Sequence, residues 1–140
     1  DAKKLPGIVV DDDEARVTGE WKESTAGKTF VGDSFRHDGN ACDGKATARF
    51  EAKLPKSGRY EVRLGYVSNS NRSTKTAVEI IYAGGTKRMI VNQKTPAPID
   101  GLFLSLGQFE FTAGQPAAVV VSNEGADGYV IIDAVQWLPQ

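Results

Sequence analysis

The sequence predicts an all-β protein, an antiparallel β-sandwich of the jelly-roll kind with about nine strands. Three observations support this: several segments alternate apolar and polar residues, turns rich in Gly or Pro separate them, and no 11-residue window carries a helical stripe. Tyr60, Val62, Leu64 and Tyr66, for example, form one apolar row. Such alternation is typical of strands with one buried face, and many short strands closed by tight turns favour a sandwich.

The expected strands follow in order along the chain. An apolar run predicts strand 7–10, and residues 29–35 read as a second strand. Strands 45–51 and 60–67 alternate on either side of the turn at 55–58. Strands 76–82 and 87–91 flank the turn at 83–85, and strands 102–111 and 117–122 flank the turn at 112–115. After the turn at 125–128, the row of Tyr129, Ile131, Val135 and Trp137 predicts the last strand, 129–138.

Length and composition indicate one domain over residues 1–140, which we expect to be a module of a longer chain. The 140 residues can form a core, and the 17 basic residues against 18 acidic ones leave no strong field for nucleic acid or a membrane surface. The longest apolar runs are far shorter than the ~20 residues of a membrane helix. Cys42 is the only cysteine, which excludes an intrachain disulfide and argues against a thiolate metal cluster.

The loops suggest where a ligand binds. If successive strands are antiparallel, alternate loops emerge at the same end of the sandwich. One set, at 36–44, 68–74, 92–101 and 123–128, is long and polar, whereas the other has the short turns at 55–58, 83–85 and 112–115 together with the long segment 13–28. Binding residues concentrate on loops held by a rigid scaffold, so the polar end is the predicted site.

Carbohydrate is the ligand that these polar loops predict, because sugar hydroxyls bind to amides, carboxylates and guanidinium groups. The same residues are also common turn formers, which is the alternative for each of them. The basic members of the set suit an acidic glycan. The predicted carbohydrate-binding residues are Arg36, His37, Asp38, Asn40, Asn71, Arg72, Asn92, Gln93 and Asn123.

No catalytic residue is predicted. His37 is the only histidine, and adjacency to Asp38 does not complete a triad. Trp137 ends a buried strand and is expected in the core, whereas Trp21 is either a core residue or a sugar platform.

Acidic residues offer oxygen ligands for a structural calcium ion, and we expect no other cofactor. Asp11 and Asp13 follow the first strand, and Asp133 lies on the apolar face of the last one. A carboxylate on such a face must be paired, hydrogen-bonded to backbone or metal-bound. The predicted calcium ligands are therefore Asp11, Asp13 and Asp133, with a backbone hydrogen bond as the alternative role of Asp133 and a solvated turn as that of the acidic run.

Several motifs resemble the golvesin and xanthan-lyase carbohydrate-binding-like domains of bacterial multidomain proteins, some of them described as FAD-dependent oxidoreductases. They are Val9–Asp13, Gly19–Trp21, Arg36–Asn40, Leu54–Val62, Asn71–Thr74, Val91–Gln93, Pro98–Gly101, Leu106–Gly107 and Ile132–Gln136. The resemblance covers almost the whole chain and implies carbohydrate binding. It fits a galactose-binding-like jelly roll. Cys42 departs from the small polar residue expected in its loop.

The sequence is compatible with three functions. The first is a non-catalytic carbohydrate-binding module that tethers an attached catalytic domain to a polysaccharide, outside the cell or in the periplasm. The second is a structural or protein-interaction domain that packs against its parent enzyme or forms oligomers. The third, a glycosidase with paired carboxylates, is the least favoured, because the sequence does not establish the ~5–10 Å separation that its mechanism requires.

Overall fold

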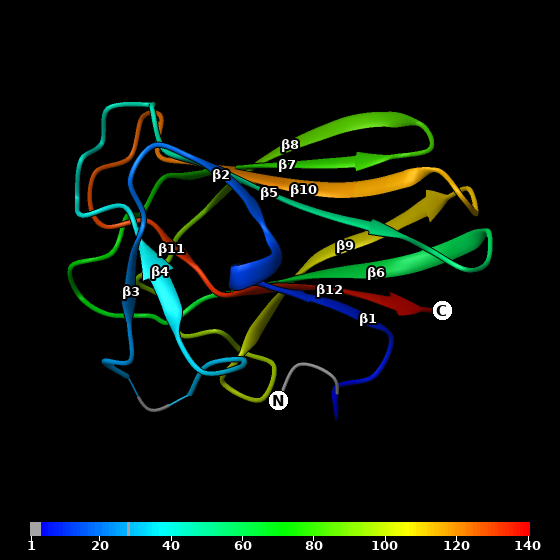
Figure 1. Ribbon diagram of the computed structural model, residues 1–140, viewed down its shortest axis with the longest axis horizontal. Coiled ribbons are helices and arrows are strands. Elements are labelled where there is room, and N and C mark those ends of the chain that lie inside the picture. Colours follow the sequence, from blue (N-terminus) through cyan, green and yellow to red (C-terminus); the bar gives the residue numbers. More distant parts are fainter. Residues whose placement is uncertain (1–3, 28) are drawn as a thin grey trace.

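The computed structural model describes residues 4–27 and 29–140 and confirms the predicted all-β class (Figure 1). It has twelve strands rather than nine, together with one short 3-10 helix, η2, over Asp12–Glu14. Every paired strand is antiparallel to its neighbours. The strands form two main sheets and one small sheet.

The first main sheet has the order β1-β12-β6-β9, and the second has the order β2-β5-β10-β7-β8. In the first sheet the strands are β1 Ile8–Asp11, β12 Ala134–Pro139, β6 Gly58–Gly65 and β9 Phe103–Phe111. In the second they are β2 Arg16–Thr18, β5 Thr47–Lys53, β10 Pro116–Ser122, β7 Thr76–Tyr82 and β8 Gly85–Val91. The small sheet has the order β11-β4-β3, with β11 Ile131–Ile132, β4 Phe35–His37 and β3 Lys22–Ser24.

The core lies between the two main sheets and comes from the alternating apolar rows. Val62 and Leu64 of β6, and Phe50 of β5 with its cross-strand partner Val119 of β10, are fully buried. Trp137 of β12 is also fully buried, which confirms its predicted core position. Burial of a large apolar side chain contributes about 1.5–3 kcal/mol, so these rows drive the pairing of the sheets.

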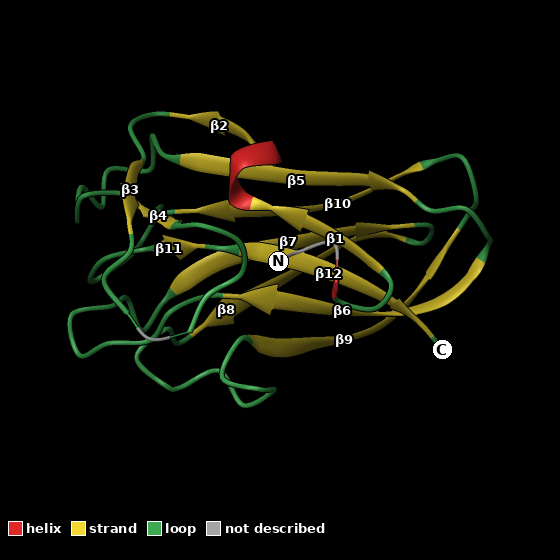
Figure 2. Cartoon of the chain, turned by 60° about the horizontal axis from the view of Figure 1, so that its bottom comes forward, coloured by secondary structure: helices red, strands yellow, loops and turns green. Residues whose placement is uncertain are grey.

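The long loops and the small sheet gather at one end of the sandwich, and the tight turns lie at the other (Figures 1 and 2). The sequence placed segment 13–28 with the tight turns, and this is wrong. β2 runs to the loop end, and β3 pairs with β4 there. Lys28, the last residue of that segment, lies outside the described residues.

Five strands differ from the expected ones: β2, β3, β4, β11 and β12. The predicted strand 29–35 becomes the shorter β4, shifted towards the C-terminus. β2 and β3 were not predicted, because they are only three residues long and mostly exposed, so they show no apolar alternation. The predicted strand 129–138 breaks at Asp133 into β11 and β12, and these two halves belong to different sheets.

Gln93 takes the place of a neighbouring strand on the free side of β11. Its side-chain oxygen accepts a hydrogen bond from the Ile131 amide at 2.8 Å, and its side-chain nitrogen donates to the Ile131 carbonyl at 2.9 Å. Both residues are completely buried. The side chain therefore satisfies two backbone groups that no strand or solvent reaches.

Replacing Gln93 tests this role. We expect Gln93→Leu to lower the free energy of unfolding by about 3 kcal/mol, because it leaves a buried amide and a buried carbonyl without partners. Urea denaturation of both proteins measures the change. The control is Asn92→Ala at the exposed neighbouring position, which removes one hydrogen bond to Lys94 and should cost less than about 1 kcal/mol. Equal losses in the two variants would contradict the proposed role of the amide.

Candidate functional site

Residues 129–133 hold the polar loops together at one end of the sandwich. Tyr129 donates its amide hydrogen to the Asn71 carbonyl at 3.0 Å, and its own carbonyl accepts from the Ser73 amide at 2.8 Å. The next amide, Val130, donates to a carboxylate oxygen of Asp38 at 3.0 Å. Loops that lie far apart in the sequence therefore meet on one short stretch of backbone.

The same stretch fixes the small sheet. Ile131 pairs with His37 and Ile132 pairs with Arg36, while the Gln93 amide occupies the other side of Ile131. The prediction that these loops converge at one end agrees with this arrangement. Eight of the nine predicted side chains fall into two groups there, and the ninth, Arg36, is paired with Asp12 instead.

The first group consists of buried side chains that hold loops to one another. Asn123 donates its side-chain amide to Asp38 at 2.9 Å and to Asp43 at 3.2 Å, and its oxygen accepts from the Ala46 amide at 3.1 Å. Asp38 also accepts from the Asn40 amide. Asn123 is fully buried and Asp38 is 4% exposed, so the polar atoms of both are engaged inside the protein.

Arg72 belongs to the same group. Its Nε donates to the Val67 carbonyl at 2.9 Å, and Nη1 donates to the side chain of Asn71 at 2.8 Å. The guanidinium carbon lies 5.8 Å from the ring centre of Phe35, and only 7% of the residue is exposed. Arg72 therefore ties its own loop and covers an aromatic core residue.

The second group is accessible. Asn40, Asn71 and Asn92 are exposed, and His37 is partly exposed. Two further residues that the sequence analysis missed lie beside His37: Tyr129, whose ring centre is 5.4 Å away in an edge-to-face arrangement, and Lys22, its partner across β3 and β4.

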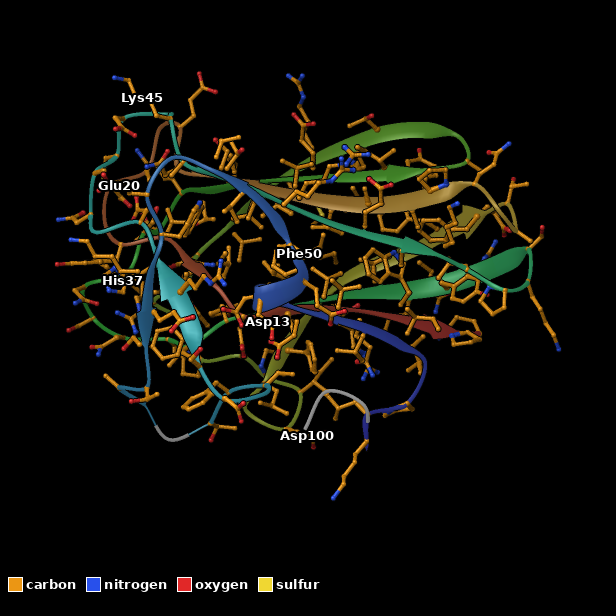
Figure 3. All side chains as sticks on the ribbon, viewed as in Figure 1. Asp13, Glu20, His37, Lys45, Phe50 and Asp100 are labelled. Carbon is orange, nitrogen blue, oxygen red and sulfur yellow. The ribbon has the colours of Figure 1, made fainter. Side chains whose placement is uncertain are left out.

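We call the group of Lys22, His37, Asn71 and Tyr129 the aromatic platform. Figure 3 shows His37 at the loop end, far from Phe50 in the middle of the sandwich. Alternation had placed Tyr129 on the buried face of a strand. The chain in fact enters β11 only at Ile131, so Tyr129 lies in the loop before it. Only the break in the predicted strand could have revealed this aromatic residue.

His37 is a neutral hydrogen-bonding group in this setting. Burial lowers its pKa, Arg72 and Lys22 add to the effect, and Asp38 opposes it. Nδ1 accepts a hydrogen bond from the Gly39 amide at 3.0 Å, so the single ring proton of the neutral form resides on Nε2. The imidazole can therefore donate one hydrogen bond to a ligand.

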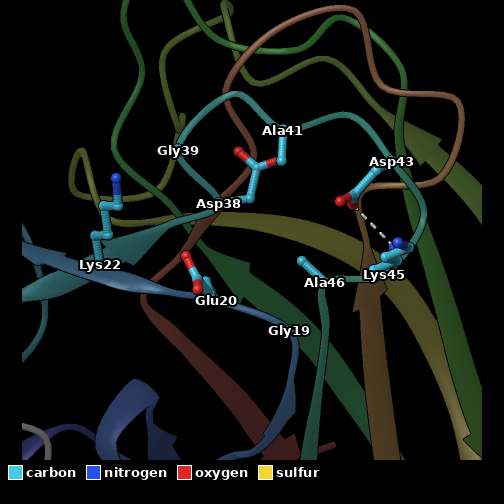
Figure 4. A pocket seen from close by; sticks show the side chains of 9 residues that line it. All are labelled: Gly19, Glu20, Lys22, Asp38, Gly39, Ala41, Asp43, Lys45 and Ala46. Carbon is cyan, nitrogen blue, oxygen red and sulfur yellow. Dashed lines mark hydrogen bonds between the residues drawn. The ribbon is translucent and has the colours of Figure 1, made fainter.

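A hollow of about 350 Å³ adjoins the platform, between residues 19–22 and the loop 38–46 (Figure 4). Lys22 belongs to the platform and also lines the hollow. Glu20 and Asp43 contribute carboxylates to it, and Figure 4 shows both on its wall. The backbone amide of Lys45 and the Asn123 side chain hold the pKa of Asp43 below its usual range, so it is ionised at neutral pH. The hollow can thus accept hydrogen bonds from hydroxyl groups.

Trp21 and Cys42 are held by the surrounding backbone. The Trp21 indole nitrogen donates to the carbonyls of Thr18 and Thr47, each at 3.1 Å, and the ring is half-buried against the core. Cys42 has a positive φ of 51° and donates weakly through sulfur to Gly128. Burial raises the pKa of its thiol.

A carboxylate cluster lies between η2 and the break of the last strand. Asp11, Asp12 and Asp133 each bring one oxygen to it, and these atoms lie within 4.8 Å of one another. The amide of Asp12 donates to the Asp133 carbonyl at 2.8 Å, which joins the two segments. Asp13, predicted as a ligand, is exposed and is absent from this group, in which Asp12 stands instead.

Asp133 has the backbone role that the sequence left open. Its Oδ2 accepts from the Val31 amide at 2.9 Å, whereas Oδ1 is buried and has no hydrogen-bond partner among the described residues. Burial raises the pKa of Asp133 to about 7 and that of Asp12 to about 8. The neighbouring Asp11 raises both further, and Arg36 opposes the rise at Asp12.

The oxygens of this cluster fit a hard cation. Carboxylates are preferred ligands of Ca²⁺, and a buried carboxylate oxygen without a hydrogen bond is one that a cation would satisfy.

Within residues 4–27 and 29–140, no helix is long and apolar enough to cross a membrane. The fold and its loop end define a jelly-roll β-sandwich module. The chain belongs to the Golvesin C-terminal domain family, which matches residues 8–138. The family resemblance seen in the sequence motifs is therefore confirmed.

Known relatives agree with this assignment. The chain is 36% identical to a xanthan lyase of Bacillus sp. (strain GL1) over 96% of its length, and it spans only 15% of that protein. The structure of a Paenibacillus xanthan lyase matches 95% of the chain and 13% of the enzyme, with a TM-score of 0.89 and 29% identity.

A family 35 carbohydrate-binding module from Clostridium thermocellum has the same fold. Its TM-score is 0.63 at 11% identity, with 95% of this chain and 98% of that one covered.

Asn123 offers a test of how the loop end is built. We expect Asn123→Ala to lower the free energy of unfolding by about 2–4 kcal/mol, because the Ala46 amide and the Asp38 carboxylate both lose a buried partner. Chemical denaturation measures this loss. Glu124→Ala at the adjacent exposed position is the control and should change stability by less than about 0.5 kcal/mol. If Asn123→Ala changes the free energy of unfolding as little as Glu124→Ala does, then Asp38 and Ala46 find other partners.

Proposed function

We propose that this domain is a non-catalytic carbohydrate-binding module that tethers an attached catalytic domain to a polysaccharide, in an extracellular or periplasmic protein. The observation that carries the proposal is the aromatic platform. Tyr129 and His37 present ring surface beside the exposed amide of Asn71 and the ammonium group of Lys22. A sugar ring requires this combination, an apolar surface for its C–H face and polar groups for its hydroxyls.

Similarity to known proteins supports the proposal. The xanthan lyase relatives are much longer than this chain, and a solved family 35 carbohydrate-binding module has a fold of this kind over 98% of its chain. A module whose sequence matches one part of a large polysaccharide lyase is suited to keeping the enzyme on its substrate.

The arrangement around His37 argues against hydrolysis. Both oxygens of Asp38 are already engaged, with the Val130 and Asn40 amides and the Asn123 side chain. A carboxylate held in this way orients loops and does not activate a histidine for catalysis. Binding is therefore the activity that these groups support.

An acidic polysaccharide is the ligand class we favour. Lys22 is exposed on the platform, where its ammonium group offers a positive charge to a ligand. A uronate or pyruvyl carboxylate next to the stacked ring would pair with the Lys22 ammonium. The hollow beside it, with Glu20 and Asp43, would receive the neutral hydroxyls of the adjoining sugar.

Affinity gel electrophoresis tests the function. The native gels contain xanthan, polygalacturonate or a neutral β-glucan. We expect retardation on at least one acidic gel, weakened at least about tenfold by Tyr129→Leu, which preserves apolar packing but removes the flat ring. Lys22→Gln should weaken retention on acidic gels only. Arg59→Gln, an exposed residue at the turn end, is the control and should bind normally.

The outcomes separate the two leading functions. Retention on none of the gels would overturn the carbohydrate proposal. An oligomer seen by light scattering and lost in Tyr129→Leu would instead favour the structural or protein-interaction alternative.

A further inference from the structure

Three of the five buried side-chain atoms without hydrogen bonds in the described part of the chain lie at the carboxylate cluster. They are Asp12 Oδ2, Asp133 Oδ1 and Arg36 Nε. Asp12 and Asp133 are 2% and 1% exposed, so bulk solvent does not reach them. Leaving such groups unsatisfied costs about 1–3 kcal/mol each, more for a charged group. The concentration of these atoms at one place indicates a missing ligand.

The charge points to a cation. Three carboxylates meet there, and Arg36 is the basic group paired with them, through Nε at 3.2 Å from Asp12 Oδ2. This ion pair lacks the geometry of a hydrogen bond, since both of its atoms are among the unsatisfied ones. Protons can take up part of this charge, since the pKa of Asp12 is raised to about 8 and that of Asp133 to about 7. With all three carboxylates ionised, one guanidinium leaves two negative charges uncompensated. A divalent ion would balance them.

Ligand chemistry selects calcium among the common divalent ions. The cluster offers only oxygen, so it does not suit the nitrogen and sulfur preference of zinc. Ca²⁺ accepts about six to eight oxygens in irregular arrangements, whereas Mg²⁺ requires a near-ideal octahedron and retains several waters. Burial of Asp12 and Asp133 leaves little room for such waters.

Arg36 also contacts a second carboxylate. Its Nη2 lies 4.0 Å from Glu23, which is exposed on β3. Arg36 therefore has an alternative partner if a cation takes Asp12. Because Arg36 and Glu23 face each other across β4 and β3, the exchange would occur within the small sheet that carries His37 and Lys22.

We propose that Ca²⁺ and Arg36 compete for Asp12, so that cation binding by Asp11, Asp12 and Asp133 is coupled through β4 to the aromatic platform. The link is short, because Arg36 and His37 are neighbours on a three-residue strand paired on both sides. Its effect on sugar binding rests on the proposed function, whereas the cation site and the competition do not.

The backbone of Gly32 lies directly against the carboxylate of Asp11 and bounds the site there. A Cβ at this position would clash with Asp11 Oδ2, and the backbone has a φ of +71° that side chains rarely adopt. The Asp11 carboxylate therefore packs against the bare backbone of Gly32, and any larger residue at position 32 would displace it.

Calcium titration of the purified, chelator-treated domain tests the proposal, with melting temperature and calorimetry as readouts. We expect saturable binding of one ion, weakened at least about tenfold in Asp133→Asn and in Asp12→Asn. Asp13→Asn, a neighbouring exposed carboxylate outside the cluster, is the matched control and should bind as the parent does. Absence of a melting shift and of heat at millimolar Ca²⁺ would overturn the site.

The competition has its own test. Arg36→Gln removes the positive charge beside Asp12 and should tighten Ca²⁺ binding by about fivefold or more. Unchanged or weaker affinity in this variant would refute the competition, provided that its circular dichroism spectrum matches the parent.

The coupling between Ca²⁺ binding and the aromatic platform can be measured without any glycan. His37 is the only histidine, so its ring signals in an NMR spectrum are unambiguous. In the parent, we expect Ca²⁺ to shift the His37 signals with the same midpoint concentration as in calorimetry. In Arg36→Gln the shift should be smaller. His37 signals that stay fixed while Ca²⁺ binds would refute the coupling, whatever the gels show about carbohydrate.

Discussion

The loop end depends on one constraint, which is that the buried backbone of residues 129–133 must find hydrogen-bond partners outside a regular sheet. The break at Asp133 moves the chain from the small sheet to a main sheet, so neither β11 nor its flanks have a full ladder. Asp38 and Gln93 supply the missing partners from two different loops, and Asn71 and Ser73 supply backbone groups from a third. Buried backbone must be satisfied, and here that requirement draws the loops together.

This constraint separates two kinds of polar residue that look alike in a sequence. The polar groups of Asp38, Gln93 and Asn123 bond to backbone and to one another, so these side chains can be buried. Arg72 is buried with Nε and Nη1 bonded to its own loop. Exposed Asn40 and Asn71 and the rings of the platform remain to meet a ligand. The proposed ligand recognition therefore depends on a few accessible side chains, and the buried polar residues beside them fix their positions.

Sequence reasoning recovered the class and most strands because alternation over six or more residues, as in β6 and β7, records a buried face directly. It also placed the polar loops at one end. It could not recover β2 and β3, which are short, exposed and defined only by distant partners. The choice of Asp12 over Asp13 at the carboxylate cluster depends on η2, and the partial exposure of Tyr129 depends on where β11 begins. A capping box of Asp11 and Glu14 marks η2 locally, whereas the position of Asp133 beside Asp12 and the start of β11 are tertiary facts.

A rigid loop end has consequences for affinity. The loops are tied to residues 129–133 by buried hydrogen bonds, so a ligand does not have to order them, and that entropic cost of binding is small. The proposed platform is nevertheless narrow, since two rings and a few polar groups would contact only about one or two sugars. The affinity of one site is therefore limited by contact area. A polysaccharide repeats its epitope along the chain, and an attached enzyme that carries such a module gains retention through rebinding at neighbouring repeats. Weak contact through a rigid platform suits a tether that must release and move.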